Sequence, residues 1–322
     1  MKYWKTLLPL FLSSLVFYLF FRDVNQAELK TIFSSLDRGW LVSALLLKTI
    51  SLCIHEYRLW YAIHEPRPNI IQTMQVGFSN ALLNLIFPWR AGDIIAIAML
   101  KKICALRVGV ATFAIGMVSF FEAAIFGVLM MFMMIWQAPL WISLIGEQKH
   151  LEGFQAVTGM TLLGIGIFVI GAMIGRRYLS QAPEPEEHFA PIPWLKDSLK
   201  QTARGIQSPR YLLLNSAVSF IEVWLMIAAF ALGFYALGIE LVTPWTTAGL
   251  ILGFSALASI ILPPTYGAGT AAAAIFVLGM MGVSEEQAIG YSAVWWLISQ
   301  VPAMLLGIPA LWILRKWDKK IE

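Results

Sequence analysis

Long apolar segments alternate with short polar ones along most of this chain. A helix needs about 20 apolar residues to cross a hydrocarbon core about 30 Å thick. About six segments meet this requirement: 5–21, 40–62, 108–136, 154–175, 211–236 and 286–314. The pattern predicts an all-α polytopic membrane protein with about six transmembrane helices.

Two further apolar regions, 69–100 and 244–282, differ from these single spans. Each is interrupted by proline near its middle, Pro88 in the first region and Pro264 in the second. Proline breaks a helix because it lacks a backbone N–H and clashes with the preceding turn. We therefore expect two helical hairpins, each either re-entrant or made of two short full crossings.

The two interrupted regions carry their breaks at matching positions. The first reads PNIIQTMQVGFSNALLNLIFPWRAGD and the second reads PWTTAGLILGFSALASIILPPTYGAG. Without a gap, Pro68 aligns with Pro244 and Pro88 aligns with Pro264. Paired segments of this kind in the two halves of a membrane protein point to a substrate site where two repeats meet.

The distribution of basic residues predicts the orientation of the helices, because cytoplasmic loops collect Lys and Arg. If both regions are hairpins, most of the basic residues fall on one side. The opposite side then holds only Arg22, Lys30, Arg38 and Lys149. This topology places both termini in the cytoplasm and makes the hairpins inverted copies, the first open to the cytoplasm and the second to the outside.

The same topology divides the chain into four parts. Residues 1–39 hold the first span and an outer amphipathic segment, and 40–136 form the first repeat. Residues 137–215 hold a connecting span and the cytoplasmic loop 176–210, and 216–322 hold the second repeat and a basic C-terminus.

Composition supports a membrane protein and argues against nucleic acid as a partner. Hydrophobic residues make up 59% of the chain and charged residues 13%, with a mean hydropathy of +0.72. A soluble globule of this size needs more polar surface. The formal charge of +4 comes from basic residues at the ends of apolar segments, where they orient helices.

Several charged side chains fall inside the apolar regions, where each costs about 2.5–3.5 kcal/mol and therefore needs a reason. They are Lys48, His55, Glu56, Arg90, Asp93, Glu122 and Glu222. Arg90 and Asp93 follow the break at Pro88. A guanidinium there either holds a phosphate through two hydrogen bonds or pairs with Asp93 to brace the hairpin.

Glu122 and Glu222 lie in otherwise apolar spans. Each either stays protonated, takes part in a proton relay, or neutralises a buried cation such as Lys48 or Arg90. Glu56 and Arg58 are expected at the cytoplasmic end of their span, lining the mouth of the first hairpin.

The run His55-Glu56-Tyr57-Arg58-Leu59 begins like the helix of a zinc protease. That chemistry needs a second histidine where Leu59 stands. We expect no metal and no cofactor.

The ordered motifs of the two hairpins resemble the transmembrane region of lysylphosphatidylglycerol synthases and the flippase-like membrane proteins related to it. The first motif is matched by Asn84, Pro88, Arg90, Ala91, Gly92 and Asp93, with Trp89 replacing a glycine. The second is matched by Pro263, Pro264, Gly267 and Gly269, with Ala272 near the place of a glutamate. A third motif survives only as Glu122. The resemblance implies a lipid flippase-like fold with inverted hairpins.

Three hypotheses of function follow. The leading one is a flippase-like transporter in the bacterial inner membrane that moves an anionic phospholipid or a polyprenyl-phosphate-linked headgroup between leaflets. The alternative is a non-transporting scaffold for an envelope glycosyltransferase or assembly complex. A membrane transferase is the third, and it lacks a clustered His/Asp/Cys constellation in a water-facing loop.

The leading hypothesis assigns two sets of residues. The predicted substrate-binding residues are Asn84, Arg90, Asp93, Glu122, Glu222, Tyr266, Glu56 and Arg58. The predicted hinge residues of the hairpins are Pro88, Gly92, Pro263, Pro264, Gly267 and Gly269.

Overall fold

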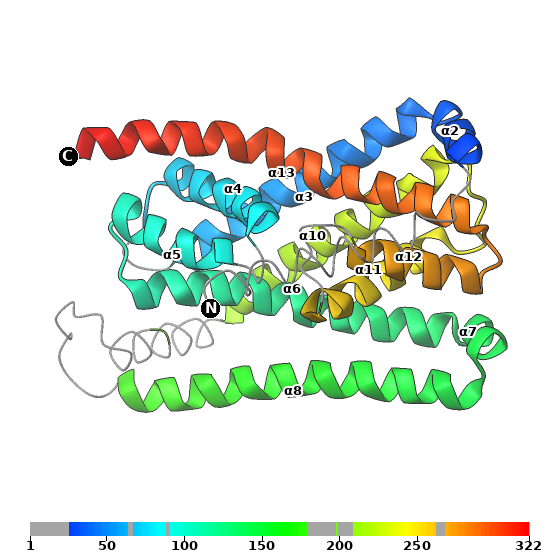
Figure 1. Cartoon of the computed structure of the whole chain (residues 1–322). Helices are drawn as coiled ribbons and strands as arrows, with labels where there is room; N and C mark the ends of the chain where they lie inside the picture. Colours follow the sequence, from blue (N-terminus) through cyan, green and yellow to red (C-terminus); the bar gives the residue numbers. More distant parts are fainter. Residues whose placement is uncertain are drawn as a thin grey trace, which may run out of the picture. The chain divides into compact units, whose positions relative to one another are not determined.

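The computed structural model describes residues 26–63, 67–87, 91–179, 198, 209–261 and 268–321 (Figure 1). These residues form helices and contain no strand. In chain order the helices are α2 (Gln26–Ser34), α3 (Arg38–Ala62), α4 (Ile70–Ile86), α5 (Ala91–Cys104), α6 (Val108–Trp136), α7 (Ala138–Ile145), α8 (Glu147–Leu179), α10 (Pro209–Ala236), α11 (Pro244–Ile261), α12 (Ala268–Met280) and α13 (Glu285–Ile321).

Five of the described helices are long and apolar enough to cross a membrane. They contain the ranges Arg38–Ala62, Val108–Trp136, Leu151–Ile170, Arg210–Ala236 and Glu285–Lys316. These ranges match the predicted spans from 40–62 onward, so the polytopic all-α fold is confirmed. The predicted first span, 5–21, lies outside the described residues.

The apolar surface of α8 is typical of a helix that faces lipid. No residue in its most apolar stretch is buried, and Leu163 is 65% exposed. A surface of this kind is unfavourable in water and favourable against hydrocarbon tails.

Both interrupted regions are pairs of short helices, as predicted. The first hairpin consists of α4 and α5, which are 17 and 14 residues long. The second consists of α11 and α12, which are 18 and 13 residues long and pack against each other. The second arm of each pair is too short to cross a bilayer alone. The side from which each hairpin enters the membrane stays a prediction.

Side-chain caps fix the first turns of several helices. Asn69 Oδ1 accepts a hydrogen bond of 2.8 Å from the backbone N–H of Ile71 at the start of α4. Ser284 Oγ accepts one of 3.3 Å from the N–H of Gln287 at the start of α13. Pro244 begins α11, where its missing N–H costs nothing.

The structure departs from the sequence prediction around α7 and α8. The short helix α7 was not predicted, and it packs against α6 and α8 near the turn that joins them (Figure 1). Helix α8 continues to Leu179, past Arg176, where the cytoplasmic loop was expected to begin. Of the rest of that loop, the structure describes only Ser198, Pro209 and Arg210.

The chain forms two compact units, each with its own packing. One contains the described residues of Met1–Ile50, Leu83–Ala91 and Trp224–Met304. In this unit the Phe230 and Trp295 rings stack at 3.5 Å, and the Tyr291 hydroxyl donates to the Phe230 carbonyl oxygen. These contacts join α10 to α13.

The other unit contains the described residues of Ser51–Leu82, Gly92–Val223 and Leu305–Glu322. Its core brings together Leu59 from α3, Val76 from α4, Leu100 from α5 and Phe121 from α6. This unit also holds the buried charged residues described next.

Candidate functional site

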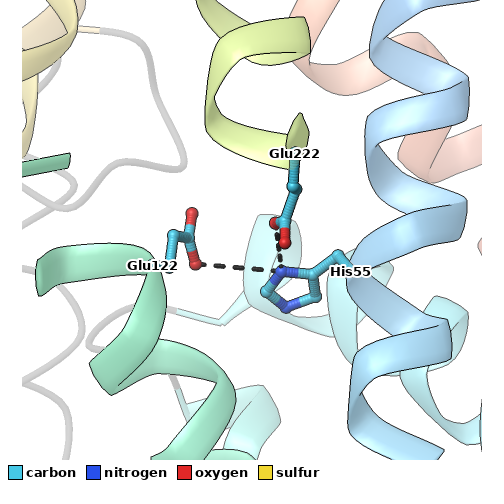
Figure 2. A group of neighbouring side chains, drawn as sticks. All are labelled: His55, Glu122 and Glu222. Carbon is cyan, nitrogen blue, oxygen red and sulfur yellow. Dashed lines mark hydrogen bonds and ion pairs between the residues drawn. The ribbon is translucent and has the colours of Figure 1, made fainter. Parts of the chain in front are cut away.

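Four ionisable side chains from three helices meet inside the second of these units, and Figure 2 shows three of them, His55, Glu122 and Glu222. His55 Nδ1 lies 2.7 Å from Glu222 Oε1 and 3.8 Å from Glu122 Oε2. Arg58 donates from Nη1 to Glu222 Oε2 and from Nη2 to the Val118 carbonyl oxygen, the latter at 3.0 Å. We call His55, Arg58, Glu122 and Glu222 the charged cluster.

The charged cluster has one deeply buried pair and one more accessible pair. The side chains of Arg58 and Glu222 are only 1% and 4% exposed, whereas those of His55 and Glu122 are 26% and 30% exposed. A buried charge is stable only when an opposite charge and hydrogen bonds accompany it. Arg58 and Glu222 therefore form the fixed part of the cluster, and His55 and Glu122 its accessible edge.

Helical spacing explains why these residues converge. Ser51, His55 and Arg58 follow one another at intervals of four and three residues, so they share one face of α3. All three residues contact Glu222. His55 and Arg58 bond to its carboxylate, and Ser51 Oγ donates to its backbone carbonyl oxygen at 3.2 Å.

The facing side of α10 has the same spacing. Asn215, Ser219 and Glu222 are all buried, with exposures of 2%, 0% and 3%. The polar face of α3 therefore contacts α10 at Glu222, which lies on the polar face of that helix.

Glu56 lies beside the charged cluster and is 3% exposed. It faces Gly77 on α4 so closely that a Cβ on that glycine would overlap the Glu56 carboxylate. Gly77 is thus required for this approach of α3 to α4. Glu56 also interacts electrostatically with His55, Glu122 and Glu222, and with Asp93 on α5.

Asp93 stands in the first turn of α5, three residues after Arg90. Asn80 on α4 donates from Nδ2 to Asp93 Oδ1 at 2.9 Å. This hydrogen bond joins the two arms of the first hairpin close to their break. Asn84 follows Asn80 by one helical turn on α4.

The structure brings most of the predicted substrate-binding residues that it describes into one region. Glu56, Arg58, Glu122 and Glu222 lie together, and Asp93 interacts with Glu56. Glu56 and Arg58 are both buried, and their place at the mouth of the first hairpin stays a prediction. The side chains that contact the Glu222 carboxylate include His55 and Arg58, and the sequence had named neither as its partner.

Two of the predicted hinge residues are also described. Gly92 is buried in α5, and Gly269 is buried in α12, in the other unit. The remaining predicted residues lie outside the described ranges: Arg90, Tyr266, Pro88, Pro263, Pro264 and Gly267.

The sequence prediction counted His55 among the charged residues of the apolar regions but did not place it among the substrate-binding residues, although the signal was present. Its only other mention was as the start of a discarded zinc-protease motif. Its spacing from Ser51 and Arg58 marks a polar face on an otherwise apolar span, and this pattern predicts a contact with another polar helix face.

The donor atoms of the charged cluster suit a proton better than a metal ion. His55, Glu122 and Glu222 each offer one atom of a type that binds metals, and these atoms lie within 4.8 Å of one another. The His55–Glu222 hydrogen bond already engages two of them, and Arg58 adds a positive charge to the same carboxylate. That charge opposes the binding of a divalent cation.

The fold and these buried charges together define a polytopic membrane protein with a polar interior. The chain belongs to the family described as the lysylphosphatidylglycerol synthase TM region, whose family model matches residues 6–307. Comparisons with curated proteins and with solved structures give no match. Membership of this family indicates a membrane protein of lipid-related function.

Proposed function

We propose that this protein moves an anionic lipid, or a lipid-linked anionic headgroup, between the leaflets of the bacterial inner membrane. The proposal rests on the position of the buried charges. They lie in the unit that also holds most of the first hairpin. Asp93 is held at the start of α5 by Asn80, and it interacts with Glu56 beside the charged cluster. Polar groups buried inside a membrane protein mark substrate and ion pathways.

The break in the first hairpin provides the place for the headgroup. Helix α5 begins at Ala91, directly after Arg90, and the unpaired N–H groups of its first turn favour an anion. In this proposal the Arg90 guanidinium contacts the phosphate through two hydrogen bonds. Asp93 fixes the position of the arm through Asn80, and the acyl tails stay in the lipid.

The second hairpin would supply the opposite gate. Helices α11 and α12 pack against each other and repeat the broken pattern of α4 and α5. In an inverted repeat, rocking of one half against the other exposes a central site alternately to each side. We propose this motion for the repeats 40–136 and 216–322, with both termini in the cytoplasm.

A leaflet-exchange assay tests the proposal. The purified protein is reconstituted in vesicles that carry a fluorescent anionic phospholipid or its zwitterionic analogue, and the labelled lipid in each leaflet is followed over time. We expect the wild type to move the anionic lipid faster than protein-free vesicles do. Arg90→Ala and Asp93→Ala should each reduce this rate by about tenfold or more, the loss expected when a charged contact is removed.

The controls separate a lost site from a lost fold. Glu240→Ala changes an exposed carboxylate and should keep the wild-type rate. Melting curves in detergent show whether each variant is folded. Full activity of both folded variants, Arg90→Ala and Asp93→Ala, would remove the proposed site. A wild type that moves no lipid and co-purifies with a constant protein partner would favour the scaffold instead.

A further inference from the structure

We propose that His55, between Glu122 and Glu222, binds a proton that is transported together with the anionic headgroup. This inference rests on the proposed function and adds a second ligand to it. The proton is held by the imidazole, whose Nδ1 donates to Glu222 in the protonated form. No covalent bond to the substrate forms or breaks.

The first argument is the geometry around one ring nitrogen. His55 Nδ1 is 2.7 Å from Glu222 Oε1 and 3.8 Å from Glu122 Oε2 (Figure 2). A proton on Nδ1 can be donated to Glu222, and a small rotation of the Glu122 side chain would bring a second acceptor within hydrogen-bond distance. Chains of His and Glu inside a membrane protein are the groups that proton pathways use.

The second argument is the balance of charge. With His55 protonated, the charged cluster has two cations, His55 and Arg58, and two anions, Glu122 and Glu222. Loss of the proton leaves an excess negative charge where the effective dielectric constant is low. The remaining acidic groups that interact with the cluster are Glu56 on α3 and, through Glu56, Asp93 on α5. Of these two, Glu56 acts on His55 itself and favours a cation there.

The third argument is access. His55 and Glu122 are 26% and 30% exposed, whereas Glu222 is 4% exposed and held by Arg58. Glu122 can therefore exchange a proton with the surroundings, while Glu222 stays fixed as the inner acceptor. The proton can therefore reach His55 from the exposed side of the cluster, where Glu122 also lies.

Coupling to the headgroup follows from the position of Asp93. An anionic headgroup bound beside α5 adds negative charge near Glu56 and thus favours the proton on His55. By linkage, a proton on His55 favours the anionic headgroup by the same factor. The two ligands therefore bind together and cross together.

The test measures lipid and proton movement in the same vesicles. Wild-type protein is reconstituted with the fluorescent anionic lipid and an internal pH dye, and a pH gradient is imposed with the potential clamped. We expect the initial rate of lipid movement away from the acidic side to rise by about fivefold or more, within the usual range of coupling between two sites. Proton movement should accompany it.

Variants test whether the coupling between lipid and proton movement depends on the charged cluster. His55→Gln should abolish the proton movement and the response to the gradient, because the amide keeps a polar contact with Glu222 but does not titrate. His150→Gln, which changes a histidine outside the cluster, should respond as the wild type does. Glu122→Gln is a second test, and we expect it to slow proton movement.

The possible failures are distinct. A wild type that moves no lipid contradicts the proposed function itself. If the wild type moves lipid equally fast with and without the gradient and moves no protons, the proton site alone is contradicted. Zinc or manganese bound stoichiometrically to the wild type and lost in His55→Gln would also overturn it, because the cluster would then hold a metal ion.

Discussion

Arg58 and Glu222 show at the level of single residues what a buried charge requires. Arg58 donates to the Glu222 carboxylate and to the Val118 carbonyl oxygen, and its side chain is 1% exposed. Neither residue is stable alone in this place, because an unpaired buried charge loses its hydration without compensation. The pair thus joins α3, α6 and α10.

Removal of one partner should destabilise the protein strongly. Glu222→Gln leaves the Arg58 charge buried without a counter-charge, and we expect a loss of about 3–5 kcal/mol in the free energy of unfolding. Replacement of both partners in Arg58→Met/Glu222→Met should restore most of that loss, since no buried charge remains. Melting temperatures and denaturant unfolding in detergent measure both effects.

Glu122→Gln is the matched control for this prediction. Glu122 is 30% exposed and lies 3.8 Å from His55, so its loss should cost about 1 kcal/mol or less. A loss in Glu222→Gln as small as that in Glu122→Gln would contradict the account of the buried pair.

At the scale of elements, small residues let the helices of this unit approach closely. Gly77 on α4 accommodates the Glu56 carboxylate of α3. Gly307 on α13 packs against α4, where a Cβ would lie 2.7 Å from the Phe78 carbonyl oxygen. Glycine at such contacts allows backbones to meet where a larger side chain would separate them.

Gly77→Ala tests this close approach. The added methyl group overlaps the Glu56 carboxylate, so α3 and α4 must move apart or Glu56 must change its position. We expect a loss of about 1–3 kcal/mol in the free energy of unfolding, the usual effect of overpacking. Gly77→Ala/Glu56→Ala should recover part of it, because the overlapping group is then gone.

Gly116→Ala is the control, since a Cβ on that glycine meets nothing within 4 Å. Both positions lie inside helices, so the two substitutions gain the same helix propensity. Unfolding of the two variants in detergent gives the comparison. Equal stability of Gly77→Ala and Gly116→Ala would show that the α3–α4 contact is not tight.

The sequence predicts the elements better than it predicts the contacts between them. The long apolar runs predicted the bounds of five spans closely, because length and hydropathy determine where a membrane helix forms. The partners of Glu222 were not predicted, because Arg58 is far from it in the chain and only the fold brings them together. The polar faces of α3 and α10 offered a signal that spacing along each helix could have revealed.

At the scale of the whole molecule, the account depends on two broken hairpins in an inverted repeat. Each hairpin is a pair of short helices, as the breaks in 69–100 and 244–282 predict, and the family match extends over residues 6–307. The domain division at 40–136 and 216–322 remains a proposal. It requires that the two hairpins open to opposite sides of the membrane.

Sidedness of cysteine labelling tests this requirement most directly. In a variant without Cys53 and Cys104, single cysteines replace Arg67 and Lys101 at the ends of the first hairpin, and Val242 and Glu285 at the ends of the second. All four positions are exposed. An impermeant maleimide should label Arg67→Cys and Lys101→Cys from the cytoplasmic side only, and Val242→Cys and Glu285→Cys from the outside only. Labelling of Arg67→Cys and Lys101→Cys from opposite sides, or of all four from one side, would contradict the inverted hairpins.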